Sequence, residues 1–341
     1  MRPISLPAVP YDATAVRPDW AELPAPLRTA IEDRLGAPVV AARTAGAGFT
    51  RGFAAVLDTA GGDRVFVKAA SLSDQPDLCD WYAREAAVTA ALPAGIAVPR
   101  PRWSLVAAGH FVLCLAAVDG RVPALPWRPA ELEATLAGYA RIAVALREPP
   151  AELLRVGLPT LAGLAVADLA WWREIAAGHE PMPALPPPVR ERLPELVALE
   201  SRLPRYAETG YAETGSVIHC DLRLDNVLID GDGRAWFCDW NWLCHGPAWF
   251  DLAGLLVTAY ASGLDADAIF AAQPAAAGAP PDGLDAALAA LCGYWLVRAE
   301  AGPTTASPHV RGHQRWSGEL ALAWLAERQG WTELAPGGDL R

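Results

Sequence analysis

The spacing of hydrophobic and polar positions changes near residue 120 of this chain. Before that point, short alternating runs are separated by glycine-containing turns, and they cover residues 39–43, 53–58, 64–69, 103–107 and 110–116. Helical spacing occurs at about 19–35, which ends at Gly36, and at 78–92, which ends before Pro93. We therefore expect an antiparallel sheet with an N-terminal helix and one key helix between its strands.

The rest of the chain is predicted to be mainly helical. Segments rich in alanine and leucine follow at residues 131–147, 161–176, 189–208 and 249–328, the last interrupted by loops near 275–282 and 303–308. One short extended region, residues 216–237, lies among them. This order predicts an α+β fold with a β-rich lobe of residues 1–118 and a mainly helical lobe of residues 119–341 that holds a small β insert.

Composition narrows the class of protein. Hydrophobic residues make up 52% of the 341 residues and charged residues 20%, which is typical of a globular chain. Neither a signal-peptide core nor a run of roughly 20 apolar residues is found, so we expect a cytoplasmic protein without a membrane partner. A net charge of -11 disfavours nucleic acid and is compatible with a cationic small substrate. The six cysteines form no CxxC pair and are predicted to be reduced thiols. The sequence does not distinguish a monomer from a homodimer.

Two rare residue types fall at informative positions. Lys68 is the only lysine among the 28 basic residues, and Asn226 and Asn241 are the only asparagines. An ammonium is a compact point charge whereas a guanidinium is a wide planar fork, so a tight phosphate site can distinguish the two. Lys68 is therefore a candidate phosphate-binding residue.

The strongest functional pattern is the run HCDLRLDN from His219 to Asn226, which is followed by an apolar hairpin and Asp239. A phosphoryl-transfer site needs a carboxylate near the acceptor hydroxyl and oxygen ligands for Mg²⁺. Asp221, Asn226 and Asp239 supply these groups. Because the strands of a hairpin run antiparallel, Asn226 and Asp239 are expected at the same end of it.

This run resembles the catalytic loop and metal-binding segment of the aminoglycoside phosphotransferase family, relatives of the protein kinases. The order of elements is similar over nearly the whole chain. The resemblance implies a bilobal protein-kinase-like fold, in which residues 1–118 form the nucleotide-binding lobe and residues 119–341 form the catalytic and substrate-binding lobe. By the same resemblance, Asp221 deprotonates the acceptor hydroxyl while Asn226 and Asp239 hold Mg²⁺. It also implies that His219 supports the loop from behind and that Asp251 braces it.

A second group of residues is predicted to bind the nucleotide, which is ATP or GTP. Lys68 ends the run VFVK, which resembles the kinase strand whose lysine reaches the phosphates. Glu85 is its expected partner, because this carboxylate lies on an otherwise apolar helix face and calls for a cation. Pairing of Glu85 with Arg84 or exposure to solvent is the alternative.

The glycine loop, residues 46–52, is a weaker candidate for the nucleotide site. Gly48, Phe49 and Thr50 could place backbone N–H groups over the phosphates, but the loop lacks GxGxxG spacing and an ordinary hairpin turn is the alternative. By resemblance only, the connector from Leu115 to Val118 would offer backbone hydrogen bonds to the base.

Two further features have open interpretations. Arg223 could stabilise the transferring phosphoryl group beside Asp221, or it could pair with Asp225 or another carboxylate. Several tryptophans of the helical half could stack on an acceptor ring, although core packing is expected for most: Trp171, Trp172, Trp242, Trp295 and Trp316.

With the resemblance, these residues predict an ATP- or GTP-dependent small-molecule O-phosphotransferase. An aminoglycoside or another antibiotic is the leading acceptor, with antibiotic resistance or self-protection as the role. One alternative is a metabolic kinase that acts on choline, homoserine or a sugar. Another is a pseudokinase-like binding protein, which the joint presence of Lys68, Asp221, Asn226 and Asp239 disfavours.

Overall fold

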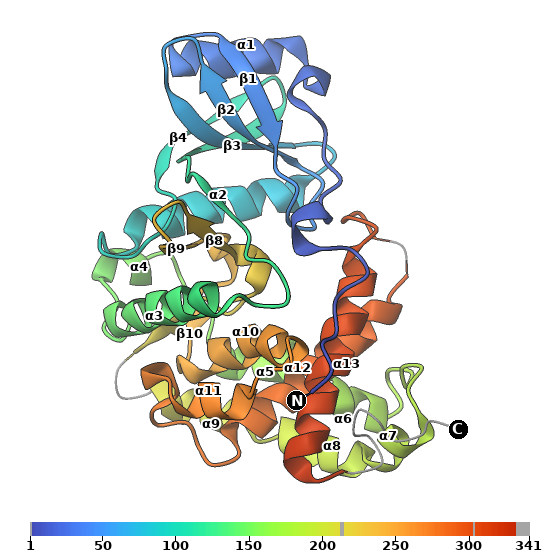
Figure 1. The fold of residues 1–341 in the computed structure, drawn as a ribbon. Coiled ribbons are helices and arrows are strands. Elements are labelled where there is room, and N and C mark those ends of the chain that lie inside the picture. Colours follow the sequence, from blue (N-terminus) through green and yellow to red (C-terminus); the bar gives the residue numbers. More distant parts are fainter. Residues whose placement is uncertain (1, 212–214, 303, 332–341) are drawn as a thin grey trace.

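The computed structural model describes residues 2–211, 215–302 and 304–331, which form two lobes (Figure 1). One lobe is built on a β-sheet and the other on helices, which confirms the expected α+β fold. All six cysteines are free thiols, as predicted. None of the helices in the described ranges combines the length and the apolar character needed to cross a membrane.

A five-stranded antiparallel sheet forms the N-terminal lobe, with strand order β1-β2-β3-β5-β4. Its strands are β1 (Val39–Thr44), β2 (Phe53–Thr59), β3 (Arg64–Ser71), β4 (Pro101–Ala107) and β5 (His110–Ala116). Lys68 on β3 pairs with Ala54 on one side and Leu113 on the other, so it lies at the centre of the sheet.

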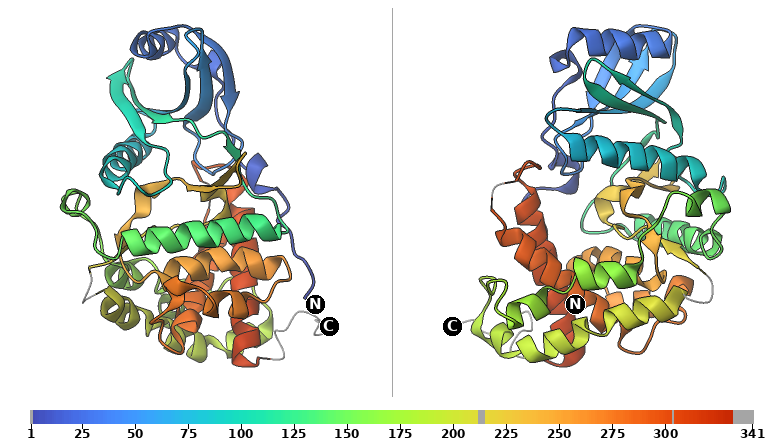
Figure 2. Two further views of the ribbon diagram at one scale, coloured as in Figure 1. Left: turned by 60° about the vertical axis from the view of Figure 1, so that its left-hand side comes forward. Right: turned by 180° about the vertical axis from the view of Figure 1, so that it is seen from behind.

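Two helices cover opposite faces of this sheet (Figure 2). Successive residues of a strand point to opposite faces, and β5 shows this directly. Its Val112 packs in the core beneath α1 (Ala25–Leu35), whereas Leu113 packs in the core against α2 (Pro76–Ala91). α2 is the key helix expected over residues 78–92, and it carries Glu85 toward β3.

The N-terminal helix is shorter than the predicted range of 19–35. A 3₁₀ turn, η2 (Trp20–Glu22), comes first, and α1 begins only at Ala25. Pro24 explains the break, because the residue before a proline is held in extended backbone and proline itself fits only the first turn of a helix. Gly36 ends α1 with a φ of 77°, as the sequence predicted.

Helices α3 to α13 make up the C-terminal lobe, with α10 almost entirely buried at its centre. Their bounds are α3 (Pro129–Ala145), α4 (Ala151–Leu154), α5 (Leu161–Ala167), α6 (Trp171–Ala176), α7 (Pro187–Glu191), α8 (Leu193–Glu200), α9 (Leu203–Tyr211), α10 (Trp249–Ala261), α11 (Ala266–Ala271), α12 (Gly283–Glu300) and α13 (Val310–Gln329).

Two predicted helical segments of this lobe are divided. Residues 161–176 form α5 and α6, and residues 189–208 fall in α7, α8 and α9. Pro194 and Pro204 account for the second division, because each stands in the first turn of a new helix, where its missing N–H costs nothing.

Two small sheets lie among these helices and position the site. One contains β6 (Gly120–Arg121), β8 (Val227–Asp230) and β9 (Ala235–Phe237), and the other pairs β7 (Val217–Ile218) with β10 (Cys244–His245). They are the small β insert expected from residues 216–237, extended by β6 and β10. Since β6 follows β5 directly in the chain, the connector passes from the first sheet to the edge of the insert.

Candidate active site

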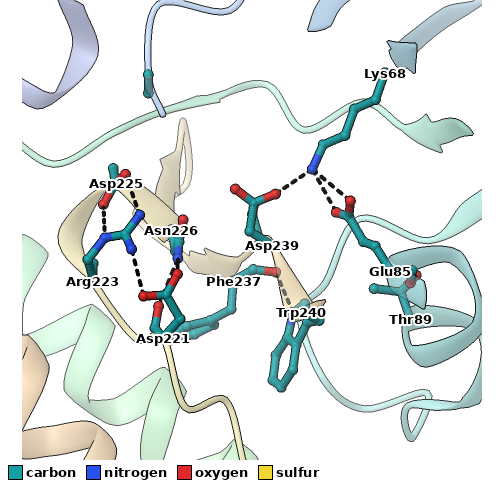
Figure 3. A network of polar contacts seen from close by, with 12 residues as sticks. Lys68, Glu85, Thr89, Asp221, Arg223, Asp225, Asn226, Phe237, Asp239 and Trp240 are labelled. Carbon is teal, nitrogen blue, oxygen red and sulfur yellow. Dashed lines mark hydrogen bonds and ion pairs between the residues drawn. The ribbon is translucent and has the colours of Figure 1, made fainter. Parts of the chain in front are cut away.

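The hairpin of β8 and β9 brings the two predicted metal ligands to one end. Its register pairs Val227 with Phe237, and the N–H of Cys238 donates to the carbonyl oxygen of Asn226 at 2.9 Å. Asp239 follows with a φ of 58°, a left-handed conformation that is uncommon for a residue with a side chain. Figure 3 shows the Asp239 carboxylate between Asn226 and the Lys68 side chain.

The loop that precedes β8 is held by Asp251 on α10. The two carboxylate oxygens of Asp251 accept the backbone N–H groups of His219 and Cys220, each at 2.8 Å. The Tyr139 hydroxyl donates to the same carboxylate at 2.9 Å. Cys220 has a φ of 65°, and such a conformation costs on the order of 1–3 kcal/mol unless its surroundings enforce it. Asp251 supplies that enforcement.

His219 ties this loop to the strand that ends at Asp239. Its Nε2 donates to the carbonyl oxygen of Cys238 at 2.8 Å, and its Nδ1 accepts the N–H of Asp221 at 3.4 Å. Burial lowers the pKa of His219, so the ring is neutral near pH 7 and both contacts are satisfied by one tautomer. His219 therefore supports the loop rather than exchanging protons.

Asp221 is oriented from two sides. Nη1 of Arg223 lies 2.6 Å from Oδ1, and Nδ2 of Asn226 donates to Oδ2 at 3.2 Å and to the backbone carbonyl of Asp221 at 2.8 Å. Burial raises the pKa of Asp221 to about 6, although Arg223 opposes the shift. The group is thus ionised at neutral pH and more basic than an ordinary carboxylate, which suits a general base.

Arg223 pairs with both neighbouring carboxylates. Its Nε and Nη2 donate to the two oxygens of Asp225, each at 3.0 Å, while Nη1 contacts Asp221. The Asp225 side chain is completely buried, so the guanidinium compensates a charge that would otherwise be costly. Of the two interpretations left open by the sequence, the pairing with Asp225 is observed, and it holds the cation beside Asp221.

Lys68 is the centre of a second network (Figure 3). Its ammonium donates to both oxygens of Glu85, at 2.9 and 2.8 Å, and also contacts the Asp239 carboxylate. Burial alone would lower the pKa of Lys68, but Asp239 and Glu85 outweigh it and raise the pKa. Glu85 therefore pairs with Lys68 and not with Arg84, which donates instead to the carbonyl of Asn241 at 3.0 Å.

A cavity of about 330 Å³ lies between the lobes, and we call it the Lys68 cavity. Its walls include Lys68, Glu85 and Asp239 together with three other residues expected near the nucleotide: Thr50, Leu115 and Val118. The structure thus brings the predicted nucleotide-binding residues together except for Gly48 and Phe49.

A second cavity, of about 380 Å³, opens beside the loop that contains Asp221 and Arg223, and we call it the Asp221 cavity. Asp221 and Arg223 form part of its wall, and Phe49 lies here rather than in the Lys68 cavity. Its other aromatic lining residues are Tyr11, Trp171, Trp242, Phe250, Tyr294 and Trp295. Of the five tryptophans singled out from the sequence, three line this cavity, whereas Trp172 is fully buried in the core.

Two residues at these cavities were not predicted from the sequence. Tyr11 lines the Asp221 cavity and Arg17 lines the Lys68 cavity, and both come from the proline-rich segment before the first predicted helix. Neither belongs to a recognisable motif. Their position depends on long-range packing between the chain start and both lobes.

The donor atoms near Asp239 fit a Mg²⁺ ion shared with phosphates. Protein sites usually hold Mg²⁺ through one or two oxygen ligands, with water and substrate phosphates completing the shell. Across the described ranges there is no cluster of three or more His, Cys, Asp or Glu side chains suited to a metal. Asn226 and Asp239 offer an amide oxygen and a carboxylate, and Lys68 lowers the pKa of Asp239 despite its burial. These two residues would hold the ion.

Comparison with known proteins identifies related folds and a family. The chain shares its fold with an aminoglycoside phosphotransferase from Alicyclobacillus acidocaldarius subsp. acidocaldarius DSM 446, with a TM-score of 0.50, 16% identity, and coverage of 86% of this chain and 93% of the other. A candidate fructosamine-3-kinase from Haemophilus somnus 129PT gives a TM-score of 0.53 at 13% identity, with coverage of 86% and 96%. No curated protein matches the chain by sequence. The sequence model of the phosphotransferase enzyme family matches residues 43–328, and the chain therefore belongs to that family.

Proposed function

We propose that this chain transfers the γ-phosphoryl group of ATP or GTP, bound with Mg²⁺, to a hydroxyl of a small molecule. The observation that carries the proposal is the placement of Asp221 and Asp239 in two separate cavities that Asn226 links. Asn226 donates to Asp221, and its backbone carbonyl accepts from the residue before Asp239. A base on one side and a metal ligand on the other is the arrangement that in-line transfer requires.

Each cavity has a part in the proposed reaction. The nucleotide occupies the Lys68 cavity, with its base near Leu115 and Val118 and its phosphates near Lys68 and Thr50. The acceptor occupies the Asp221 cavity, where Asp221 takes the hydroxyl proton as the acceptor oxygen bonds to the γ-phosphorus. The bond from that phosphorus to the bridging oxygen breaks, and the nucleoside diphosphate leaves. Bound Mg²⁺ would neutralise charge on the phosphates.

The lining of the Asp221 cavity bears on the class of acceptor. Among the described residues, its carboxylates are Asp168, Asp221 and Asp251, and Asp251 is engaged by the loop backbone. Arg223 and Arg298 line the same cavity, so these five groups together carry only one net negative charge. A polycationic aminoglycoside would leave several ammonium groups without partners there, which is costly in a partly buried site.

We therefore place a hydroxylated acceptor with a broad apolar or ring surface, and few amines, ahead of a polycationic aminoglycoside. The aromatic lining supports this order, because aromatic faces stack on rings and exclude water. An antibiotic that is not an aminoglycoside and has such a surface is therefore the leading class of acceptor. A metabolic kinase acting on choline, homoserine or a sugar is the second candidate, and it shares the same catalytic residues.

The proposal is tested by incubation of the chain with Mg²⁺, ATP or GTP and a panel of hydroxylated compounds. The panel should contain aminoglycosides, large uncharged antibiotics, choline, homoserine and sugars. We expect one class to gain the mass of a phosphoryl group, with release of the nucleoside diphosphate. Nucleotide binding without any transfer across the panel would favour the pseudokinase alternative.

A further inference from the structure

The first residues of the chain form a strap that crosses from the helical lobe to the sheet lobe (Figure 1). We call residues 2–17 the N-terminal strap, and they lie outside the family match at residues 43–328. The contacts that fix it to the helical lobe include Arg2 to Glu327 at 2.6 Å, the Ser5 N–H to the Ala261 carbonyl at 2.8 Å, His313 Nε2 to the Val9 carbonyl at 2.7 Å, and Ser307 Oγ to the Thr14 carbonyl at 2.6 Å.

The upper end of the strap packs against the glycine loop. Three successive loop carbonyls accept hydrogen bonds from it: Gly46 from the Ala15 N–H at 2.8 Å, Ala47 from Arg17 Nη2 at 2.9 Å, and Gly48 from Thr14 Oγ1 at 3.2 Å. A Cβ atom at Gly46 would lie 2.1 Å from the Asp12 carbonyl oxygen, and one at Gly48 would lie 2.7 Å from Arg17 Nη2. These two glycines therefore make room for the strap.

Arg17 extends from the strap into the Lys68 cavity. It lines that cavity together with Lys68, Glu85 and Asp239. Its charge acts on the site, because Arg17 is one of the groups that lower the pKa of Asp239 and oppose the rise of the pKa of Glu85. Its Nε is buried without a hydrogen-bond partner among the described residues. A guanidinium has five donors, and Ala47 uses one of them.

The charge balance of the cavity calls for another cation. Lys68 is already neutralised by Glu85 and Asp239, so these three groups together carry one net negative charge. A nucleoside triphosphate adds several more negative charges. Two other arginines line the cavity, but Arg121 pairs with Glu131, and Arg43 is one of the charges that lower the pKa of Asp58 on β2.

We propose that Arg17 is a second phosphate-binding residue for the nucleotide, delivered by the N-terminal strap. This inference rests on the proposed function. Its buried Nε and remaining Nη groups would donate to phosphate oxygens, and the strap anchors on the helical lobe would hold the guanidinium in place. A guanidinium can contact two oxygens at once, which distinguishes its role from that of the Lys68 point charge.

The test is calorimetric binding of ATP and of adenosine to the full chain and to Arg17→Ala, Arg17→Lys and Arg17→Gln. Loss of charge-assisted phosphate contacts should weaken ATP binding by about tenfold to a hundredfold in Arg17→Ala while adenosine binding is unchanged. Arg17→Lys should recover part of the affinity. Arg102→Ala is the matched control, because Arg102 is an exposed arginine on β4 whose contact with Asp63 is 3.5 Å long.

Each outcome decides a specific point. Unchanged ATP affinity in Arg17→Ala overturns the inference, and so does an equal loss for ATP and adenosine, which would mean that Arg17 only positions the glycine loop. Failure of the wild-type chain to bind either ATP or GTP would count against the proposed function instead. If Arg17→Ala does not fold, Arg17→Lys must bind ATP more tightly than Arg17→Gln, and equal affinities contradict the inference.

Discussion

Asp221 and Arg223 contact each other at 2.6 Å, between Oδ1 and Nη1, in the wall of the Asp221 cavity. Burial raises the pKa of Asp221 to about 6, and Arg223 limits the rise. Because Arg223 is itself fixed by the buried Asp225, the ionisation of Asp221 is set by a rigid local network.

The rate of transfer should fall as the pH decreases through about 6. A protonated Asp221 cannot accept the hydroxyl proton, so at one pH unit below its pKa only about a tenth of the enzyme is competent. The measurement is kcat at saturating Mg²⁺, nucleotide and acceptor from about pH 5 to 8. A profile that stays flat to pH 5 would show that ionised Asp221 is not required.

Lys68→Met should destabilise the fold by about 3–5 kcal/mol, because it leaves Glu85 buried next to Asp239 without a cation. Lys68→Met/Glu85→Gln should regain part of that loss, since the uncompensated buried charge is removed. Urea unfolding of the two variants and the wild type measures the difference. The idea fails if the single variant is as stable as the wild type or the double variant is the less stable of the two.

Asp251→Asn should lower kcat and the free energy of unfolding together. The amide has one oxygen for the two N–H groups of His219 and Cys220, and an unsatisfied buried donor costs about 1–3 kcal/mol. Tyr139→Phe is the milder matched variant, because it removes one hydroxyl and leaves both backbone contacts. We expect kcat close to that of the wild type for Tyr139→Phe. A normal kcat in Asp251→Asn would argue against a bracing role.

Replacement by alanine should affect acceptor binding at one tryptophan and stability at another. Trp242 lines the Asp221 cavity, is 49% exposed and lies 5.9 Å from Trp81 between ring centroids, whereas Trp172 is fully buried. Trp242→Ala should raise the KM for the acceptor with a stability change within about 0.5 kcal/mol. Trp172→Ala should cost about 3–5 kcal/mol. Acceptor kinetics and thermal unfolding separate the two, and an unchanged KM in Trp242→Ala would place the acceptor elsewhere.

The sheet, the key helix and the main polar network were predictable from the sequence because they rest on local patterns. Period-two runs and glycine turns give β2, β3 and β5, and Glu85 could be paired with Lys68 because a carboxylate on an apolar helix face needs a cation. The hairpin after Asn226 likewise fixes Asn226 and Asp239 at one end. Helix limits were less predictable where Pro24, Pro194 and Pro204 interrupt otherwise helical spacing.

The contribution of the N-terminal strap to the two cavities was not predictable from the sequence. Gly46 and Gly48 are typical of an ordinary turn. The sequence does not show that the lack of a side chain at these positions makes room for Asp12 and Arg17. Such contacts join residues far apart in the chain, and no periodicity or motif encodes them. For the same reason Phe49 was expected near the nucleotide, whereas it lines the Asp221 cavity.

The central claim, that Asp221 is the base for phosphoryl transfer, is tested most directly by Asp221→Asn. Steady-state transfer to the acceptor identified in the panel and calorimetric nucleotide binding should be measured on the same preparation. We predict that turnover falls by about 10²–10⁴, the usual contribution of a general base, while nucleotide affinity changes by less than about threefold. Undiminished turnover in Asp221→Asn would contradict the assignment.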